Sequence, residues 1–259
     1  MYKNRDTRIN FIKNNLQRYC SGMGMGIILL DEISPAFPGD MRNPSAYPFP
    51  IQYEIAKGVN NNTLVFEADK SPIVEPIKQA AKKLERMGCK AIAAECGYFA
   101  YFQKDIAGYV NVPVFMSSLL QVSWAQQLIG PNKVVGILVA FENFMTTAHL
   151  EAVGIQPGSN YVIKGAHETG NCPFLMQQGG VAVNERTANY SDFEKQLLNV
   201  AVDFYQEHAN MGILLLECGI MQPFARAIQQ VIDIPVFSWG TLLDYAYSIA
   251  VHRDFYGHV

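Results

Sequence analysis

One tetrapeptide pattern, an aliphatic residue followed by Glu-Cys-Gly, occurs twice in the chain, in Ala94–Gly97 and Leu216–Gly219. Each copy ends a short apolar run typical of a buried strand, and each precedes an amphipathic stretch. A second apolar patch follows, with a proline 17 residues after the cysteine in both copies (from 96 to 113 and from 218 to 235). The chain is therefore predicted to be duplicated, with one thiol at the end of a buried strand in each half.

Segments that favour strands alternate with segments that favour helices along the chain. Apolar runs and β-branched residues predict strands over residues 26–30, 63–67, 91–96, 112–115, 134–139, 161–164, 213–218 and 234–237. Helical periodicity predicts helices over residues 6–19, 51–59, 71–87, 99–110, 118–128, 143–153, 192–208, 222–231 and 241–251. This alternation predicts an α/β protein with parallel sheets, arranged as two similar, pseudo-symmetric lobes that share an interlobe cleft.

The composition argues against several classes of partner. The net charge is −3 and no basic cluster exceeds Lys82-Lys83, so nucleic-acid binding is not expected. No apolar run is long enough to span a membrane, and the polar first residues lack the apolar core of a signal peptide. The five cysteines form no Cys-x-x-Cys pair, and the five histidines lack metal-binding spacing. We therefore expect a cytoplasmic protein with reduced thiols, no metal site and no membrane partner.

The low content of charged residues bears on assembly. They make up 17% of the chain, whereas about a quarter is typical of soluble domains. Buried parallel strands explain part of the difference, and a subunit interface would explain the rest, so we expect a homo-oligomer. A monomer with a well-packed core is the alternative.

The paired thiols are the strongest candidates for chemistry. Ligands of open parallel sheets bind at the carboxyl ends of the strands, where Cys96 and Cys218 are expected. The partial positive charge of a following helix would lower the pKa of each thiol, and Gly97 and Gly219 would let backbone N–H groups approach a carboxylate. Two facing thiols could remove a proton from one side of a carbon and return one from the other. The alternative is that the cysteines only pack in the core.

These features resemble the aspartate/glutamate racemase superfamily, which also contains hydantoin racemases, maleate isomerases and arylmalonate decarboxylases. The resemblance covers essentially the whole chain, and its carriers are the first strand, both cysteines, both proline-containing strands and the strand over residues 134–139. It implies two lobes, a site between them that needs no cofactor, and Cys96 and Cys218 as the two acid/base thiols.

The resemblance also implies lobe boundaries. Because the last helix of that family returns to the first lobe, we expect residues 1–117 plus 238–259 to form the first lobe and residues 118–237 the second. Amino-acid racemases of the family usually place Asn-Thr after the first cysteine and Thr after the second. This chain has Gly97-Tyr98 and Gly219-Ile220 instead. The side chains that would hold an amino-acid carboxylate and amine are therefore missing, which leaves the substrate open.

Further candidates for substrate binding lie next to expected strand ends or in a proline-rich loop over residues 32–50. The candidates are Asp31, Arg42, Gly97, Tyr98, Ser117, Ser118, Asn143, Gly219 and Ile220. The guanidinium of Arg42 could hold a carboxylate with two hydrogen bonds, although a solvated surface arginine is the alternative. Asp31 could instead cap a loop, and the serines and Asn143 could cap helices.

Two glutamates directly precede the thiols. Because side chains alternate along a strand, Glu95 and Glu217 are expected to point away from the neighbouring cysteines. One of them could be a buried, paired carboxylate rather than a catalyst. Arg186 lies in a second long loop over residues 165–190 and is a further candidate for binding a carboxylate.

The sequence thus predicts an isomerase, a cofactor-independent racemase or epimerase that inverts the α-carbon of a small carboxylate-bearing substrate such as an amino acid or a hydantoin. Cys96 and Cys218 would be its two-base pair. One alternative is a maleate-type cis–trans isomerase in which one thiol adds to the double bond. Another is a binding protein for small acids that has kept the cleft without turnover.

Overall fold

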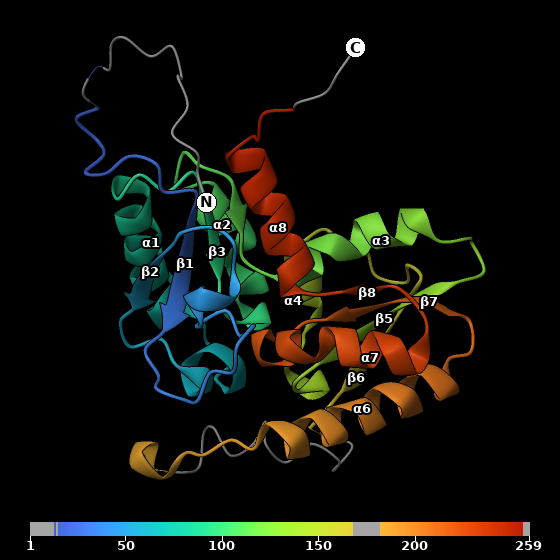
Figure 1. Ribbon diagram of the computed structural model, residues 1–259. Coiled ribbons are helices and arrows are strands. Elements are labelled where there is room, and N and C mark those ends of the chain that lie inside the picture. Colours follow the sequence, from blue (N-terminus) through green and yellow to red (C-terminus); the bar gives the residue numbers. More distant parts are fainter. Residues whose placement is uncertain (1–12, 14, 168–181, 256–259) are drawn as a thin grey trace.

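The computed structural model describes residues 13, 15–167 and 182–255. Its centre is a pair of parallel four-stranded sheets, in the orders β2-β1-β3-β4 and β6-β5-β7-β8 (Figure 1). We call these sheets and their helices the first and second lobes. The strands are β1 (Met25–Leu30), β2 (Ile51–Ala56), β3 (Ala91–Ala94), β4 (Val114–Phe115), β5 (Val134–Val139), β6 (Tyr161–Gly165), β7 (Met211–Leu216) and β8 (Val236–Phe237). The predicted α/β fold with two parallel sheets is confirmed.

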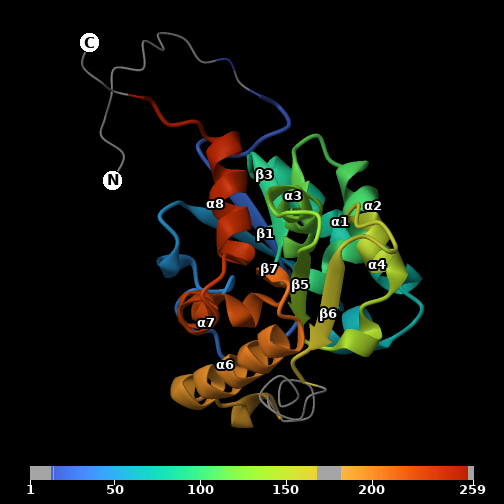
Figure 2. The ribbon, with the colours of Figure 1, turned by 90° about the vertical axis from the view of Figure 1, so that its right-hand side faces the viewer.

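Helices flank both sheets. The α-helices are α1 (Ser71–Arg86), α2 (Gln103–Ala107), α3 (Val122–Leu128), α4 (Thr147–Ala152), α6 (Tyr190–Glu207), α7 (Ala225–Ile232) and α8 (Trp239–Ala250). Short helices with tighter or wider turns are η1 (Pro44–Ala46), η2 (Asn62–Phe66), η3 (Gly97–Phe102), η4 (Ser118–Gln121), η5 (Glu142–Phe144), η6 (Val183–Glu185) and η7 (Gly219–Phe224). In Figure 2, α6 and α7 lie on the lower side of the molecule. The helix α4 packs against η3 of the first lobe.

The two sheets repeat one arrangement. The strand β1 pairs with β2 and β3, and β5 pairs in the same way with β6 and β7. The strands that lead to the two cysteines, β3 and β7, therefore occupy equivalent places. The backbone N–H of Glu95 donates to the carbonyl oxygen of Ile28 at 3.0 Å, and that of Glu217 to Leu138 at 2.9 Å. The predicted duplication is thus visible in topology and in register.

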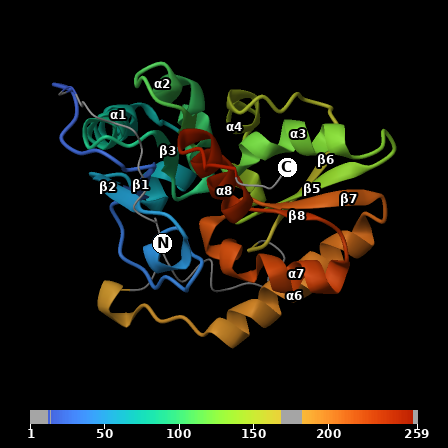
Figure 3. The same cartoon turned by 45° about the horizontal axis from the view of Figure 1, so that its top comes forward.

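The helix α8 joins the lobes. It follows β8 of the second sheet, but its buried residues Trp239 and Leu243 pack with Met25, Ile27 and Ala93 on one face of the first sheet. Figure 3 shows α8 crossing from the second sheet toward the first. A larger apolar cluster fills the opposite face of the first sheet and continues into the second lobe. Burial of these residues holds the two sheets in a constant relation.

Two segments between β1 and α1 differ from the sequence prediction. The sequence predicts a helix over residues 51–59, but β2 forms there and pairs in parallel with β1. It predicts a strand over residues 63–67, but η2 is a π-helix. The buried amino group of Lys70 donates to two carbonyl oxygens of this helix, at 3.4 Å each. These bonds satisfy carbonyl groups that a neighbouring strand would otherwise have to satisfy.

Parts of the predicted terminal and loop structure cannot be compared. Residues 6–12 and 14 of the helix predicted over residues 6–19, and residues 168–181 of the loop over residues 165–190, lie outside the described residues. Residues 15–19 form a turn and a bend, so the helix predicted there is wrong. In the described end of that loop, Arg186 donates to Oε1 of Glu32 at 3.0 Å, so the two long loops meet. Within the described ranges, no helix combines the length and apolar character needed to cross a membrane.

Candidate active site

Cys96 and Cys218 lie at the carboxyl ends of β3 and β7. Each has an extended backbone and directly precedes a short helix, η3 or η7. Cys218 is 9% exposed and Cys96 is partly buried. Gly97, directly after Cys96, lies against Glu217, directly before Cys218, and Cys218 is among the groups that raise the pKa of Cys96. The structure therefore brings the two predicted thiols together.

The two Glu-Cys-Gly segments pass directly over one another. A Cβ atom built on Gly97 would lie 2.0 Å from Oε1 of Glu217, and one built on Gly219 would lie 2.5 Å from the carbonyl oxygen of Glu95. Real Cβ atoms do not approach other atoms so closely, because their van der Waals shells would overlap. Glycine at both positions thus lets the lobes approach this closely. This close packing is a different reason for glycine than the approach to a substrate carboxylate that the sequence suggests.

Both thiols are held in the neutral form. Burial raises the pKa of Cys96 well above its ordinary value, and Glu217 raises it further. Burial also raises the pKa of Cys218, with Glu217 again the next contributor. The expectation that a following helix lowers the thiol pKa values is wrong in net effect. The backbone N–H groups of Tyr98 and Ile220 do lower them, but the cost of desolvating a thiolate is larger.

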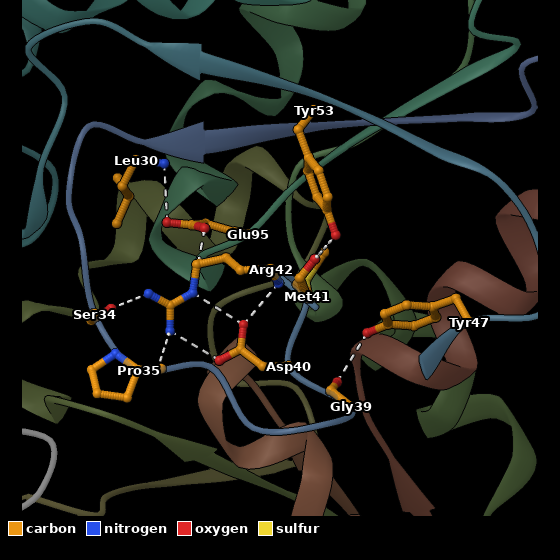
Figure 4. Close-up of polar contacts among 10 residues, drawn as sticks. All are labelled: Leu30, Ser34, Pro35, Gly39, Asp40, Met41, Arg42, Tyr47, Tyr53 and Glu95. Atoms are coloured by element: carbon orange, nitrogen blue, oxygen red, sulfur yellow. Dashed lines mark hydrogen bonds and ion pairs between the residues drawn. The ribbon is translucent and has the colours of Figure 1, made fainter. Parts of the chain in front are cut away.

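Glu95 is buried and has partners. Its Oε1 accepts a hydrogen bond from the backbone N–H of Leu30 at 3.0 Å, and its Oε2 lies 3.8 Å from Nε of Arg42 (Figure 4). Burial raises the pKa of Glu95 to about 7, while Arg42 and the Leu30 N–H oppose that rise. This glutamate is the buried, paired carboxylate that the sequence left as an option.

Glu217 is buried without such partners. Its side chain is fully enclosed, and neither carboxyl oxygen has a well-aligned hydrogen-bond donor among the described residues. Burial raises the pKa of Glu217 to about 8, and the backbone N–H of Ala140 offsets part of the rise. At neutral pH this carboxyl group therefore holds its proton most of the time.

Arg42 reaches the site from the first long loop. It binds both carboxylate oxygens of Asp40, from Nε at 3.1 Å and from Nη2 at 3.0 Å (Figure 4). It also donates to the side chain of Ser34 and to the carbonyl oxygen of Pro35. Burial opposes its charge, but attraction to Asp40 and Glu95 raises the pKa of Arg42 above its ordinary value. Most of its N–H groups already have partners in the loop. Arg42 therefore orders the loop, and it has few N–H groups left to bind a substrate carboxylate.

Several other predicted residues lie close to the thiols and support the backbone there. The buried hydroxyl of Tyr98 donates to the carbonyl oxygen of Phe141 at 2.6 Å and accepts from its N–H at 2.9 Å. Ser118 is buried and donates to the carbonyl oxygen of Leu216 at 3.1 Å. Ser117 accepts from the N–H of Leu119 and thereby caps η4. These contacts connect the first lobe to the second strand end.

Two predicted residues lie at the surface. Asp31 is exposed, accepts from the backbone N–H of Gly58 at 3.0 Å, and lies 3.6 Å from the amino group of Lys57. It therefore closes the turn after β2, which is the loop-capping role. Asn143 is exposed in η5. Ile220 is partly buried in η7, and its contribution comes from the backbone N–H that faces Cys218.

Two residues near the site were not selected from the sequence. Asp40 is 2% exposed and raises the pKa of Cys218. An acid two positions before Arg42 in a proline-rich loop was an available signal for it. Trp239 is fully buried and donates from Nε1 to the carbonyl oxygen of Glu217 at 2.7 Å. The sequence around Trp239 does not indicate this contact, because the contact depends on how α8 crosses between the lobes.

Comparisons with known proteins distinguish fold from reaction. No family model matches the chain. A dimethylsulfoniopropionate lyase of Durusdinium sp. clade D is 25% identical over 224 residues, which cover 82% of this chain and 70% of that protein. Dimethylsulfoniopropionate lyase 6 of Emiliania huxleyi (strain CCMP1516) is 26% identical over 226 residues, which cover 82% of this chain but only 56% of that protein. The chain thus spans little more than half the length of some curated relatives that it matches.

Solved structures show the fold. Unliganded arylmalonate decarboxylase superposes with a TM-score of 0.55 at 11% identity, over 90% of this chain and 94% of that one. Allantoin racemase from Pseudomonas fluorescens gives 0.53 at 12% identity, over 87% and 88% of the two chains. Aspartate racemase of Picrophilus torridus gives 0.51 at 15% identity, over 88% and 94%. The chain has the fold of the aspartate/glutamate/hydantoin racemase superfamily, as the sequence resemblance implied.

The curated relatives overturn the predicted reaction. They are named as lyases, so the prediction of a racemase or epimerase, and of an isomerase in general, is wrong. The physical reason is that paired thiols at strand ends indicate proton transfer at carbon. They do not indicate whether a proton returns to that carbon or a neighbouring group departs.

Proposed function

We propose that this chain is a lyase that removes the α-proton of a short carboxylic acid and expels a leaving group from the β-carbon. The first substrate to test is dimethylsulfoniopropionate, the compound in the names of the curated relatives. The observation that carries the proposal is the match to these lyases, which covers 82% of the chain at 25% identity. The thiols at the ends of β3 and β7 support it, because an elimination needs a base in a site with little water.

Elimination from dimethylsulfoniopropionate requires one base. The base takes a proton from the carbon next to the carboxylate, and the electron pair of that C–H bond becomes the new carbon–carbon double bond. The bond from the β-carbon to sulfur breaks, and its electrons leave with sulfur. The products are acrylate and neutral dimethyl sulfide, and the proton stays on the base until solvent removes it. Since the sulfonium group leaves without needing a proton, one thiolate is sufficient.

We assign Cys218 as that base. Burial and Glu217 raise the pKa of both thiols; at Cys218, Asp40 adds to the rise and Arg42 opposes it. The side chains that act on Cys96 among the described residues are Glu217, Cys218 and Glu95, which all disfavour a thiolate. Because a cation acts on Cys218 and none acts on Cys96 among these side chains, we take Cys218 as the thiol that loses its proton during the reaction. Cys96 stays neutral beside the substrate.

The test is direct. The purified chain is incubated with dimethylsulfoniopropionate, dimethyl sulfide is measured in the headspace, and acrylate is measured by proton NMR. We expect the two products in equal amounts, and we expect Cys218→Ser to abolish both. If the chain releases no more dimethyl sulfide than a heat-inactivated sample, the lyase proposal fails. If Cys218→Ser retains full activity and Cys96→Ser does not, the assignment of the base is reversed.

A further inference from the structure

The charged groups around the two thiols do not balance. The acids that act on the thiols are Glu217, Glu95 and Asp40, and in the described part of the chain Arg42 is the cation that opposes them. Arg42 is engaged by both oxygens of Asp40 and lies 3.8 Å from Glu95. Among the described residues, no cation acts on Glu217, and the backbone N–H of Ala140 is the group that lowers its pKa. The site therefore contains one carboxyl group whose charge, when present, the described residues leave uncompensated.

The position of this carboxyl group places it beside the reacting groups. Glu217 is fully buried, and its Oε1 lies against the backbone of Gly97, directly after Cys96. It also raises the pKa of Cys96 and of Cys218, so it lies near both thiols. Both of its oxygens are without a well-aligned donor among the described residues. Burial of an unsatisfied polar group costs free energy, so such a group in a site calls for a partner that binds there.

We propose that Glu217 selects substrates that carry a fixed positive charge, by acting as the counter-ion of an onium group bound next to the thiols. The inference rests on the proposed function and deepens it, because the sulfonium group of dimethylsulfoniopropionate is such a cation. A sulfonium or quaternary ammonium group has no N–H to donate, so its attraction to the site is electrostatic. That attraction is strong only where water is excluded, which is the environment of Glu217.

The charge state of Glu217 links binding to proton release. Burial raises the pKa of this carboxyl group to about 8, so the empty site holds the proton near neutral pH. A bound cation favours the carboxylate and lowers that pKa, so the proton must leave as the cation enters. A neutral ligand of the same shape has no such effect. Proton release on binding is therefore a signature of the counter-ion role that simple packing would not produce.

The experiment compares two ligands of equal shape by titration calorimetry near neutral pH. The probe with the onium charge, called the cationic probe, is trimethylammoniopropionate. The probe without that charge, called the neutral probe, is the carboxylate of tert-butylpropionic acid, in which carbon replaces nitrogen; both probes keep the carboxylate group. We expect the wild type to bind the cation at least about tenfold more tightly. Repeating the titration in buffers of different ionisation enthalpy should show release of close to one proton for the cation and none for the neutral probe. Glu217→Gln should lose the preference and the proton release together.

Glu95→Gln is the matched control. This variant makes the same change at the equivalent position of the first lobe, where Arg42 already provides a cation. The ratio of the affinities for the cationic and the neutral probe should therefore stay as in the wild type. Equal binding of the two probes, no binding of the cation, or no proton release by the wild type would each overturn the inference without any variant. A cation preference that survives in Glu217→Gln would overturn it as well. If dimethylsulfoniopropionate is not cleaved but the preference is found, the proposed function fails and this inference stands.

Discussion

The two Glu-Cys-Gly segments have the same sequence and different surroundings. In the first lobe, the N–H of Leu30 donates to the carboxylate of Glu95 at 3.0 Å. The equivalent N–H in the second lobe is that of Ala140, which lowers the pKa of Glu217 but is not aligned for a good hydrogen bond. The larger difference is Arg42, which the long first loop carries to Glu95. The repeated strands thus give both segments the same backbone arrangement. The loop over residues 32–50, which carries Arg42, makes the two halves electrostatically different.

This difference separates the thiols by role, and the largest predicted effect tests it. Cys218→Ser replaces the base by a hydroxyl that does not ionise near neutral pH, and we expect kcat for elimination to fall by about 10²–10⁴. Cys96→Ser should have a clearly smaller effect, because Cys96 is expected to stay neutral. The measurement is the initial rate of dimethyl sulfide release. Equal losses in the two variants would mean that the halves act as a symmetric pair.

A second prediction compares the two glutamates through the pH dependence of stability. Burial raises the pKa of Glu217 from 4.5 to about 8 and that of Glu95 from 4.5 to about 7. Between the ordinary pKa and the raised pKa of each group, the folded state holds a proton that the unfolded state has lost. Each buried carboxyl group therefore makes the fold less stable as pH rises through that range. The slope approaches about 1.4 kcal/mol per pH unit for one group.

The Gln variants isolate each contribution. Glu217→Gln should become more stable relative to the wild type as pH rises through this window, and the gain should continue to about pH 8. For Glu95→Gln the gain should end near pH 7. Urea unfolding at several pH values checks both. Identical profiles for the two variants would contradict the unequal surroundings of the two carboxyl groups.

A third prediction concerns the glycines that let the segments cross. Gly219→Ala would place a methyl group 2.5 Å from the backbone carbonyl oxygen of Glu95, which cannot move without shifting a strand end. Gly97→Ala would meet Oε1, Cδ and Cγ of Glu217, a side chain that can change rotamer more readily than a strand end can shift. We expect Gly219→Ala to lower the free energy of unfolding by about 1–3 kcal/mol and Gly97→Ala to lower it less. Chemical denaturation of the two variants would show the order, and a larger loss for Gly97→Ala would refute it.

The sequence predicted the features that depend on local pattern and repetition. The strands at both cysteines followed from apolar runs, and the equivalence of the halves followed from equal spacing to Pro113 and Pro235. It failed over residues 51–67, where a strand and a π-helix replaced the predicted order. There the outcome depends on pairing with β1 and on Lys70, which lies outside both segments. Local propensity cannot report such distant partners.

The electrostatics of the site depended on partners that are distant in sequence. A helix field was expected to acidify the thiols, but the depth of burial decided the net pKa shifts. Glu217 and Glu95 look identical in the sequence, and only the path of the first loop shows that Arg42 reaches one of them. The reaction itself was not readable from the thiols, because elimination and inversion can begin with the same proton transfer.

A fourth prediction tests the arginine directly. Arg42→Gln removes the cation that lowers the pKa of Cys218, so alkylation of Cys218 by iodoacetamide should slow by a few fold at mildly alkaline pH. Alkylation of Cys96 should change less, because Arg42 is not among the groups that act on its pKa. Mass spectrometry of the labelled peptides separates the two sites. Arg42→Lys, which keeps a positive charge, is the control and should retain most of the difference. A uniform change at both cysteines would indicate a general loosening of the loop instead.

The smallest expected effect is at the end of β1. Asp31 directly follows this strand, and the equivalent place after β5 belongs to Phe141, whose backbone bonds to the buried Tyr98. Asp31 is exposed and pairs with Lys57, which is also exposed, and ion pairs of this kind contribute little to stability. We expect Asp31→Asn to leave the elimination rate and the melting temperature unchanged within error. Because a residue at the same place in the second lobe touches the site, a large loss of activity in Asp31→Asn would mean that both first strands supply groups to the chemistry, and the asymmetry of the halves would be smaller than their charges indicate.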